Sequence, residues 1–263
     1  MDYMFSLWMQ PRAKSYSSVP NPVENSIEKH MKGTIMEMET GRVINFPGAQ
    51  HVSSQRASRP ARNSDGIKYY TEQQIKLLRR TVRDQAALDL SKYQVTAVRE
   101  WMAIDLLTCT GLRVSEAANI RCSDVRANYG ESALFVRDGK GSKSRTVQIP
   151  DSLKRHLKQF IVWKTSRGEP TGADDHLFQG QRGPWSCQAI QFLVKKHLKA
   201  LGLYENEKSV HALRHSYAVE FYRQEKDLRG LQKQLGHASI QTTQIYADVT
   251  VQDIQKQIRG LWG

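Results

Sequence analysis

Residues 133–150, which read ALFVRDGKGSKSRTVQIP, decide the fold class because they hold the only clear sheet signal in the sequence. Two extended segments, ALFVR (133–137) and RTVQIP (145–150), lie on either side of the turn DGKGSKS. Extended segments around a Gly-rich turn are typical of a β-hairpin. We therefore expect one hairpin in a chain whose other periodic segments are helical.

Helix signals occupy the chain on both sides of this hairpin. Thr71-Glu-Gln-Gln74 is a capping box ahead of apolar residues at helical spacing, which predicts that a helix begins there. A second helix is expected to stop at Gly111, and Ser115 is expected to cap a short third helix. Further helices are predicted over residues 151–163, 186–201, 210–224, 227–235 and 239–248. The predicted fold class is α+β, mainly α-helical, with a small hairpin-containing sheet.

The chain divides into two parts by composition. Residues 1–67 are rich in Pro, Ser, Asn and Gly without a sustained period, which predicts a largely flexible segment. Arg56, Arg59 and Arg62 make its last part basic, so it is either an arm that lies on DNA or a solvated linker. Residues 68–263, including a tail over 249–263, are predicted to form one folded domain.

Charge and composition exclude several classes of protein. No run approaches the ~18 apolar residues that a membrane span needs, and the N-terminus lacks the features of a secretory signal, so the expected location is the cytoplasm. The three cysteines form no CxxC pair, which argues against a disulfide framework and a thiolate zinc site. The 39 Lys and Arg against 26 Asp and Glu, a formal net charge of +13, favour nucleic acid as the partner.

The polar residues of the second half fit one reaction, the cleavage of a phosphodiester through a covalent intermediate. The candidates are Arg113, Lys140, His211, Arg214, His237 and Tyr246. Taken singly, Arg113, Lys140, His211 and Arg214 are each more often an exposed charge or a turn residue. A metal pair of His211 and His215 is disfavoured because no third ligand has a convincing spacing and Arg214 would repel a cation. No cofactor is expected.

Each candidate has a role that its chemistry allows. The guanidinium groups of Arg113 and Arg214 can hold the non-bridging oxygens of a phosphate. A tyrosine phenol has a pKa near ~10, so Tyr246 needs a proton acceptor, for which His211 is the candidate.

The remaining roles concern the leaving group and the orientation of the site. Lys140, on a Gly-flanked turn, is the candidate acid for the leaving 5′-oxygen; Lys143, Lys195 and Lys196 are weaker candidates. The ring of His237, at a loop, can hydrogen-bond the phosphate. Glu116 either pairs with a neighbouring basic residue or is a plain first-turn glutamate that favours the helix N-terminus.

The order of these motifs closely resembles the tyrosine recombinase (phage integrase) family. TGLRVSE, GKG, HALRH and LGH follow one another, and Tyr246 lies nine residues beyond His237. The resemblance covers residues 71–263. It implies catalysis by the six candidates through a 3′-phosphotyrosine link, without metal or ATP. It also implies double-stranded DNA with a specific site as substrate, a tetramer on two sites and possible accessory DNA-binding proteins.

The resemblance is incomplete ahead of residue 71. Most members of the family carry a core-binding domain there, and the 1–67 segment shows no complete one. In length the chain is like the plasmid multimer resolvases and fimbrial invertases, so resolution, inversion and integration are all open outcomes. A type IB topoisomerase and a non-catalytic, helix-turn-helix-like DNA-binding protein are the alternatives. The apolar stripe of the tail is expected to pack on its own subunit or on a neighbour.

Overall fold

The structure of the chain is a computed structural model that describes residues 67–92, 94–139, 143–180, 182–206, 208 and 210–248. Three predictions fall outside these residues: the flexible basic segment, the turn that carries Lys140, and the C-terminal tail. No helix in the described part is long and apolar enough to cross a membrane.

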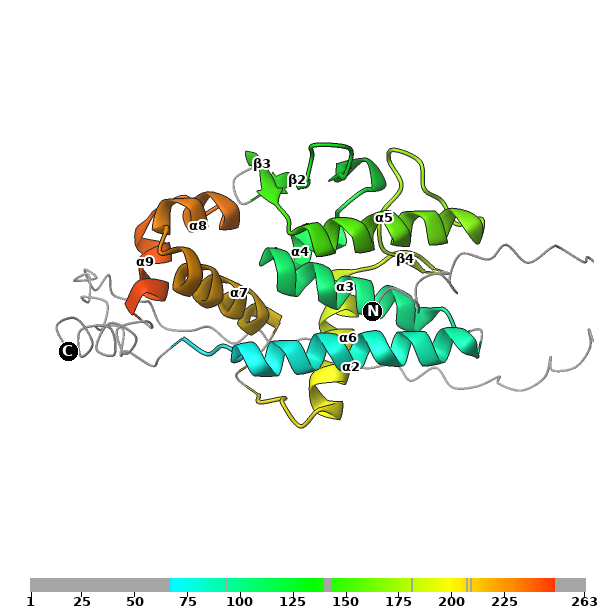
Figure 1. The fold of residues 1–263 in the computed structure, drawn as a ribbon, viewed down its shortest axis with the longest axis horizontal. Helices are drawn as coiled ribbons and strands as arrows, with labels where there is room; N and C mark the ends of the chain where they lie inside the picture. The colour runs from blue at the N-terminus through cyan, green and yellow to red at the C-terminus, as the bar shows by residue number, and fades with distance from the viewer. Residues whose placement is uncertain are drawn as a thin grey trace, which may run out of the picture. The chain divides into compact units, whose positions relative to one another are not determined.

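Helices dominate the described chain, and two small antiparallel sheets accompany them (Figure 1). In chain order the elements are α2 (Glu72–Ser91), α3 (Thr96–Thr110), α4 (Val114–Ala118), the 3-10 helix η2 (Cys122–Asp124), β1 (Val125–Arg126), β2 (Ala133–Gly139), β3 (Lys143–Gln148), α5 (Asp151–Ser166), β4 (Gln179–Gly180), β5 (Gly183–Pro184), α6 (Cys187–Ala200), α7 (Val210–Glu225), α8 (Leu228–Leu235) and α9 (Gln241–Asp248). The predicted fold class is confirmed, and each predicted helix is present within a few residues of its expected bounds.

Helix α3 is the central helix, and its sequence explains that position. It is buried on nearly every side, as expected of a helix without a polar face, and it packs against α2, α5, α6 and α7. In Figure 1 it lies between α2 and α5. It ends at Gly111, whose φ of +62° suits glycine and where a Cβ would lie only 2.5 Å from the Tyr217 ring. The predicted helix stop is therefore confirmed.

The predicted hairpin is confirmed as strands β2 and β3. They pair antiparallel, with Leu134 opposite Val147 and Val136 opposite Arg145. Strand β1 extends this sheet to the order β1-β2-β3, and β4 pairs with β5 in a second sheet. The expectation that the hairpin is the only sheet element is wrong, because strands of two residues are too short to carry a periodic signal.

The predicted helix starts hold at α2 and fail at α4. At α2, the Thr71 N–H donates to Gln74 Oε1 at 2.9 Å and the Gln74 N–H donates to Thr71 Oγ1 at 3.3 Å, which confirms the capping box. At α4 the N-cap position belongs to Arg113, and Ser115 lies inside the first turn. The Glu116 carboxylate accepts the Arg113 N–H at 2.8 Å, so the helix begins without a serine cap.

A second, smaller apolar cluster joins α7, α8 and α9, which lie together in Figure 1. Its buried members are Ala218, Val219, Leu231, Leu235 and Tyr246. Helix α9 thus packs on its own chain, and the ring of Tyr246, 2% exposed, is part of that packing. This packing sets the position of the tyrosine relative to α7.

Candidate active site

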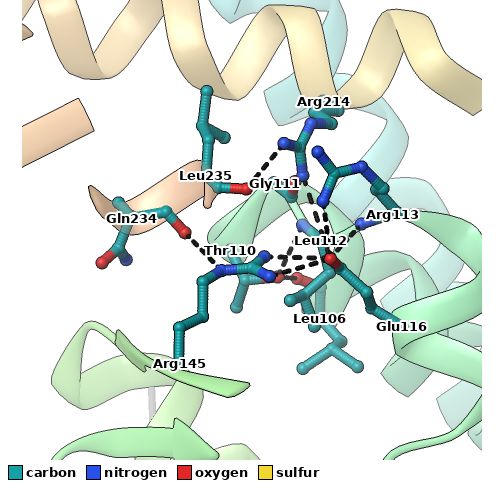
Figure 2. Close-up of polar contacts among 10 residues, drawn as sticks. All are labelled: Leu106, Thr110, Gly111, Leu112, Arg113, Glu116, Arg145, Arg214, Gln234 and Leu235. Atoms are coloured by element: carbon teal, nitrogen blue, oxygen red, sulfur yellow. Dashed lines mark hydrogen bonds and ion pairs between the residues drawn. The ribbon is translucent and has the colours of Figure 1, made fainter. Parts of the chain in front are cut away.

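Glu116 lies at the centre of the site, and three arginines from different elements surround its carboxylate (Figure 2). It is on α4, directly after the turn that ends α3, and it is 5% exposed. Arg113 precedes the same helix, Arg145 comes from β3, and Arg214 comes from α7. The sequence left two interpretations of Glu116 open, and its contacts support pairing with neighbouring basic residues.

Arg113 is held to Glu116 at two points. Its backbone N–H donates to Glu116 Oε2 and its Nη1 donates to Glu116 Oε1, each at 2.8 Å. Because Glu116 caps the helix and binds the side chain at once, the sequence spacing of three residues sets the direction of the guanidinium. The side chain of Arg113 is more exposed than that of Glu116, 23% against 3%. Arg113 therefore reaches from the buried carboxylate toward the surface.

Arg145 makes the strongest contact with Glu116, although it belongs to none of the motifs that predicted the site. Its Nη1 and Nη2 donate to the two carboxylate oxygens at 2.8 and 2.9 Å. This two-point pairing is the arrangement in which arginine and carboxylate match best. Its Nε also donates to the carbonyl of Gln234 at 3.1 Å. One signal was available: Arg145 shares its strand face with the buried Val147 and Ile149, where an apolar residue is expected.

Arg214 is oriented by two backbone carbonyls. Its Nη1 donates to Gly111 O at 2.7 Å and its Nη2 donates to Leu235 O at 2.8 Å (Figure 2). Both acceptors belong to helix ends, one after α3 and one at the end of α8. The side chain is buried, and burial followed by the nearby charge of Arg113 lowers its pKa from 12.5 to about 10. Arg214 therefore stays charged at neutral pH in a fixed position.

The electrostatic consequence is an excess of positive charge. Burial alone would oppose ionisation of Glu116, but the hydrogen bonds and charge of Arg145, and then those of Arg113, lower its pKa from 4.5 to about 2. The carboxylate is therefore ionised at neutral pH and offsets one of three guanidinium charges. Such an excess, next to buried backbone, favours an anionic ligand.

The hydroxyl of Tyr246 is in contact with a histidine on α7. Tyr246 Oη lies 2.9 Å from Nδ1 of His215, and the two ring centroids are 5.8 Å apart. The ring of His237 stacks against the tyrosine with a centroid distance of 6.4 Å and an angle of 15°. His237 is itself oriented by Thr243, whose Oγ1 lies 3.0 Å from its Nδ1. The tyrosine is thus placed between two imidazole rings.

The protonation of these groups follows from burial and charge. Burial raises the pKa of Tyr246, while the charges of Arg214 and Arg113 oppose that rise. Burial lowers the pKa of His215, with His211 and Arg214 acting in the same direction. Burial and the three arginines lower the pKa of His237 to about 4. At neutral pH the phenol is therefore protonated and both rings are neutral, so His215 can accept the phenol proton if its own proton is on Nε2.

The structure brings together four of the six predicted site residues: Arg113, Arg214, His237 and Tyr246. His211 lies one turn before His215 on the same helix and is exposed. The contact with the tyrosine hydroxyl that was expected of His211 is made by His215 instead. Both histidines fit helical spacing, so the sequence could not tell which one faces α9.

The predicted acid for the leaving 5′-oxygen, Lys140, lies outside the described residues, so its role stays a prediction. Two of the weaker candidates are engaged elsewhere. Lys196 donates to both oxygens of Glu100 at 2.5 and 2.6 Å, and Lys195 lies over the ring of Tyr204. Among the described residues, no group of three or more His, Cys, Asp or Glu gathers as it would around a metal ion.

Comparison with known proteins identifies the family. Residues 70–253 match the family model described as the phage integrase family. The chain belongs to the phage integrase family. This confirms the resemblance that the motifs predicted, and the match covers every described element of this family member.

Curated relatives of this phage integrase family member are tyrosine recombinases. Tyrosine recombinase XerA of Thermococcus onnurineus is 33% identical over 174 residues, which cover 66% of this chain and 59% of the relative. Tyrosine recombinase XerC of Caldanaerobacter subterraneus is 36% identical over 162 residues, which cover 61% of this chain and 44% of the relative. The aligned chain therefore spans only about half the length of these relatives.

Solved structures of the family share the fold. The crystal structure of XerA recombinase superposes with a TM-score of 0.59 at 30% identity, covering 77% of this chain and 67% of that one. The XerH site-specific recombinase, solved on a palindromic difH substrate in a post-cleavage complex, gives 0.61 at 22% identity, covering 75% and 54%. The second likeness concerns the fold alone.

Proposed function

We propose that this chain is the catalytic part of a site-specific DNA recombinase that cleaves and rejoins strands through a 3′-phosphotyrosine at Tyr246. One observation carries the proposal: a buried tyrosine whose hydroxyl contacts the neutral His215 lies within the electrostatic reach of Arg113 and Arg214. A nucleophile, an acceptor for its proton and countercharge for a phosphate are thus close together. Membership of the phage integrase family supports the same reaction.

In the proposed cleavage step, Tyr246 Oη attacks the scissile phosphorus. The bond between Oη and phosphorus forms while the bond between phosphorus and the 5′-oxygen breaks. The phenol proton passes to Nδ1 of His215, which lies 2.9 Å away. The leaving 5′-oxygen takes a proton from Lys140, the acid predicted from the sequence. In the rejoining step a 5′-hydroxyl attacks the phosphotyrosine, and these proton transfers run in reverse.

The phosphate would bind between the two arginines. Arg113 extends toward the surface from Glu116, and Arg214 is fixed by the carbonyls of Gly111 and Leu235. Guanidinium groups held in this way need little reorganisation when charge develops on the non-bridging oxygens. The neutral ring of His237 adds a hydrogen bond to the phosphate. The two guanidinium groups supply the charge that a metal would supply in other phosphodiester-cleaving enzymes.

The substrate of this reaction is double-stranded DNA with a specific site. The net charge of +13 supports a DNA partner. We further propose that the protein acts as a tetramer on two sites, with residues 249–263 passing between subunits. Resolution of plasmid multimers, inversion and integration differ in where the two sites lie rather than in the chemistry.

The decisive experiment traps the covalent intermediate on nicked duplexes. A library of nicked duplexes with randomised sequence, and a second set tiled across the DNA that flanks the gene, are incubated with the full chain. We expect an adduct that survives denaturation, and mass spectrometry should locate it at Tyr246. The trapped DNA is sequenced, and plasmids with two copies of the recovered site are then tested for joined recombinants.

The outcomes separate the three candidate functions. An adduct followed by recombinants supports the recombinase. An adduct, together with relaxation of supercoiled plasmid by the protein and no recombinants, favours the type IB topoisomerase. Selective binding without any adduct favours a DNA-binding protein and overturns the proposal.

The proton acceptor needs its own test, because two histidines compete for the role. His215→Gln should slow adduct formation more strongly than His211→Gln if the contact with Tyr246 carries the proton. The reverse order would return the role to His211. Both variants should bind the recovered site with unchanged affinity.

A further inference from the structure

Arg145 differs from the two phosphate-binding arginines in that each of its three guanidinium nitrogens already has a protein partner. Nη1 and Nη2 donate to the two oxygens of Glu116, and Nε donates to the carbonyl of Gln234 (Figure 2). Arg145 therefore acts on the site through other residues.

The first of those residues is Glu116, which Arg145 shares with Arg113. Glu116 Oε1 accepts hydrogen bonds from Nη1 of both arginines, each at 2.8 Å. The fork of Arg145 contacts both oxygens from β3 and so, together with the N–H of Arg113, fixes the direction of the carboxylate. The carboxylate in turn sets the direction of the Arg113 guanidinium.

The second contact connects β3 to the end of α8, directly ahead of His237. Arg145 binds the backbone carbonyl of Gln234. The side chain of Gln234 donates to Gln148 O at 2.6 Å and accepts from Gln148 N at 3.1 Å. Gly236 follows with φ +67°, and a Cβ there would lie 2.8 Å from Cδ of Arg145. Glycine at 236 thus allows both the end of the helix and the close approach of the arginine.

We propose that Arg145 is a positioning residue for DNA cleavage, which fixes the Arg113 guanidinium through Glu116 and ties it to the α8 end that presents His237. This inference rests on the proposed function. It accounts for an arginine on the inward face of β3, where neighbouring Val147 and Ile149 are buried. A residue that does not touch the substrate can, through contacts of this kind, hold the catalytic groups in the orientation that the reaction needs.

The same sheet provides a matched control. Arg137 on β2 donates from Nε to Asp124 Oδ1 at 2.7 Å, and Asp124 accepts the Arg121 N–H at 2.9 Å at the start of η2. Both pairs therefore join a strand arginine to a buried carboxylate that caps a short helix. Arg137→Gln breaks the pair without touching Glu116, Arg113 or Gln234.

The test measures adduct formation in a single turnover on the recovered nicked duplex, at saturating DNA. We expect Arg145→Gln to slow the step by about 10-fold to 100-fold, as the loss of a residue that orients a catalytic group commonly does, with unchanged DNA affinity. Arg137→Gln should keep the wild-type rate. Arg145→Lys should recover part of the rate, because it keeps one charge but not the two-point contact.

Two further readouts exclude a purely structural role. Glu116 is faced by Arg113 from the start of α4, Arg145 from β3 and Arg214 from α7, so losing Arg145 should raise its pKa. Combining Arg145→Gln with Arg113→Lys should cost less than the product of the single effects, since both act through one contact.

A measurement without DNA separates this inference from the proposed function. NMR titration of the Glu116 side-chain carboxyl should show a higher pKa in Arg145→Gln than in the wild type and Arg137→Gln. If the wild type forms no adduct on any duplex, the proposed function fails and the titration still decides whether Arg145 controls the carboxylate. An unshifted Glu116, a wild-type cleavage rate in Arg145→Gln, or equal loss in Arg137→Gln would each overturn the inference.

Discussion

Two buried carboxylates, Glu116 and Asp105, show how the same kind of ion pair serves different ends in one chain. Asp105 on α3 accepts from Nε and Nη2 of Arg79 at 2.9 and 2.7 Å, and its other oxygen lies 2.8 Å from Nδ1 of His156. Both carboxylate side chains are 3% exposed. Both also have lowered pKa values, because their cationic and hydrogen-bonding partners outweigh the effect of burial.

The difference is in the balance of charge. Asp105 has one permanent cation, Arg79, so that pair is neutral and joins α2, α3 and α5. Glu116 has three, and the charges of two of them, Arg214 and Arg113, act on the tyrosine hydroxyl. Uncompensated buried charge is unfavourable unless a counterion arrives, and a DNA phosphate has the required charge. Charge balance, rather than burial, separates the two clusters.

The largest effect on cleavage is expected from Tyr246→Phe, which removes the hydroxyl on which the charges of Arg113 and Arg214 act. The ring still packs against α7 and α8, but the attacking oxygen is gone. DNA binding should persist while the covalent adduct disappears, as measured by gel shift and denaturing electrophoresis. A normal adduct yield would show that the nucleophile is another residue.

The next largest effect tests the excess charge. Arg214→Lys should lower the cleavage rate by on the order of 10²-fold, because an ammonium group cannot reproduce a guanidinium held by Gly111 O and Leu235 O. Arg79→Lys, in the balanced cluster, should lower thermal stability without a specific effect on cleavage. The two variants are compared by their single-turnover cleavage rates, measured well below the unfolding temperature. Equal cleavage rates in the two variants would contradict the distinction between the clusters.

A change of stability with little change of cleavage is expected from Asp105→Asn. Removing one partner of a buried pair should lower the free energy of unfolding by about 3 kcal/mol at neutral pH. The folded pKa of Asp105 is lowered, so its contribution is present above the unfolded value of about 3.9 and is lost as pH falls through the folded value. Urea unfolding across acidic pH should show the wild type and the variant converging; a constant gap would contradict this.

The smallest effect is expected from removing metal ions. Three arginines supply the positive charge at the site, so adduct formation should continue at the wild-type rate in excess EDTA and without nucleotide. Complete loss, restored by added metal, would reopen the metal interpretation of His211 and His215. Either result is obtained from the trapping assay.

Several parts of this architecture could be predicted because their signals are local. The capping box at Thr71, the stop at Gly111 and the Gly-rich hairpin each depend on neighbouring residues and are confirmed. The start of α4 was mispredicted at Ser115, since a serine is a common cap but a Glu116 carboxylate can satisfy the same donors. The roles of the six candidate site residues stay predictions.

Sequence alone determined the family, the helix order and the identity of the chemical groups, because motif order and spacing are properties of the chain itself. Only the tertiary structure decided that Arg145 of β3 pairs with Glu116 and that His215 rather than His211 meets the hydroxyl of Tyr246. These contacts join residues 29 and 31 positions apart in the chain. No local signal specifies such a partner, because the packing of α4 against β2, the strand paired with β3, and of α7 against α9 sets which side chains meet.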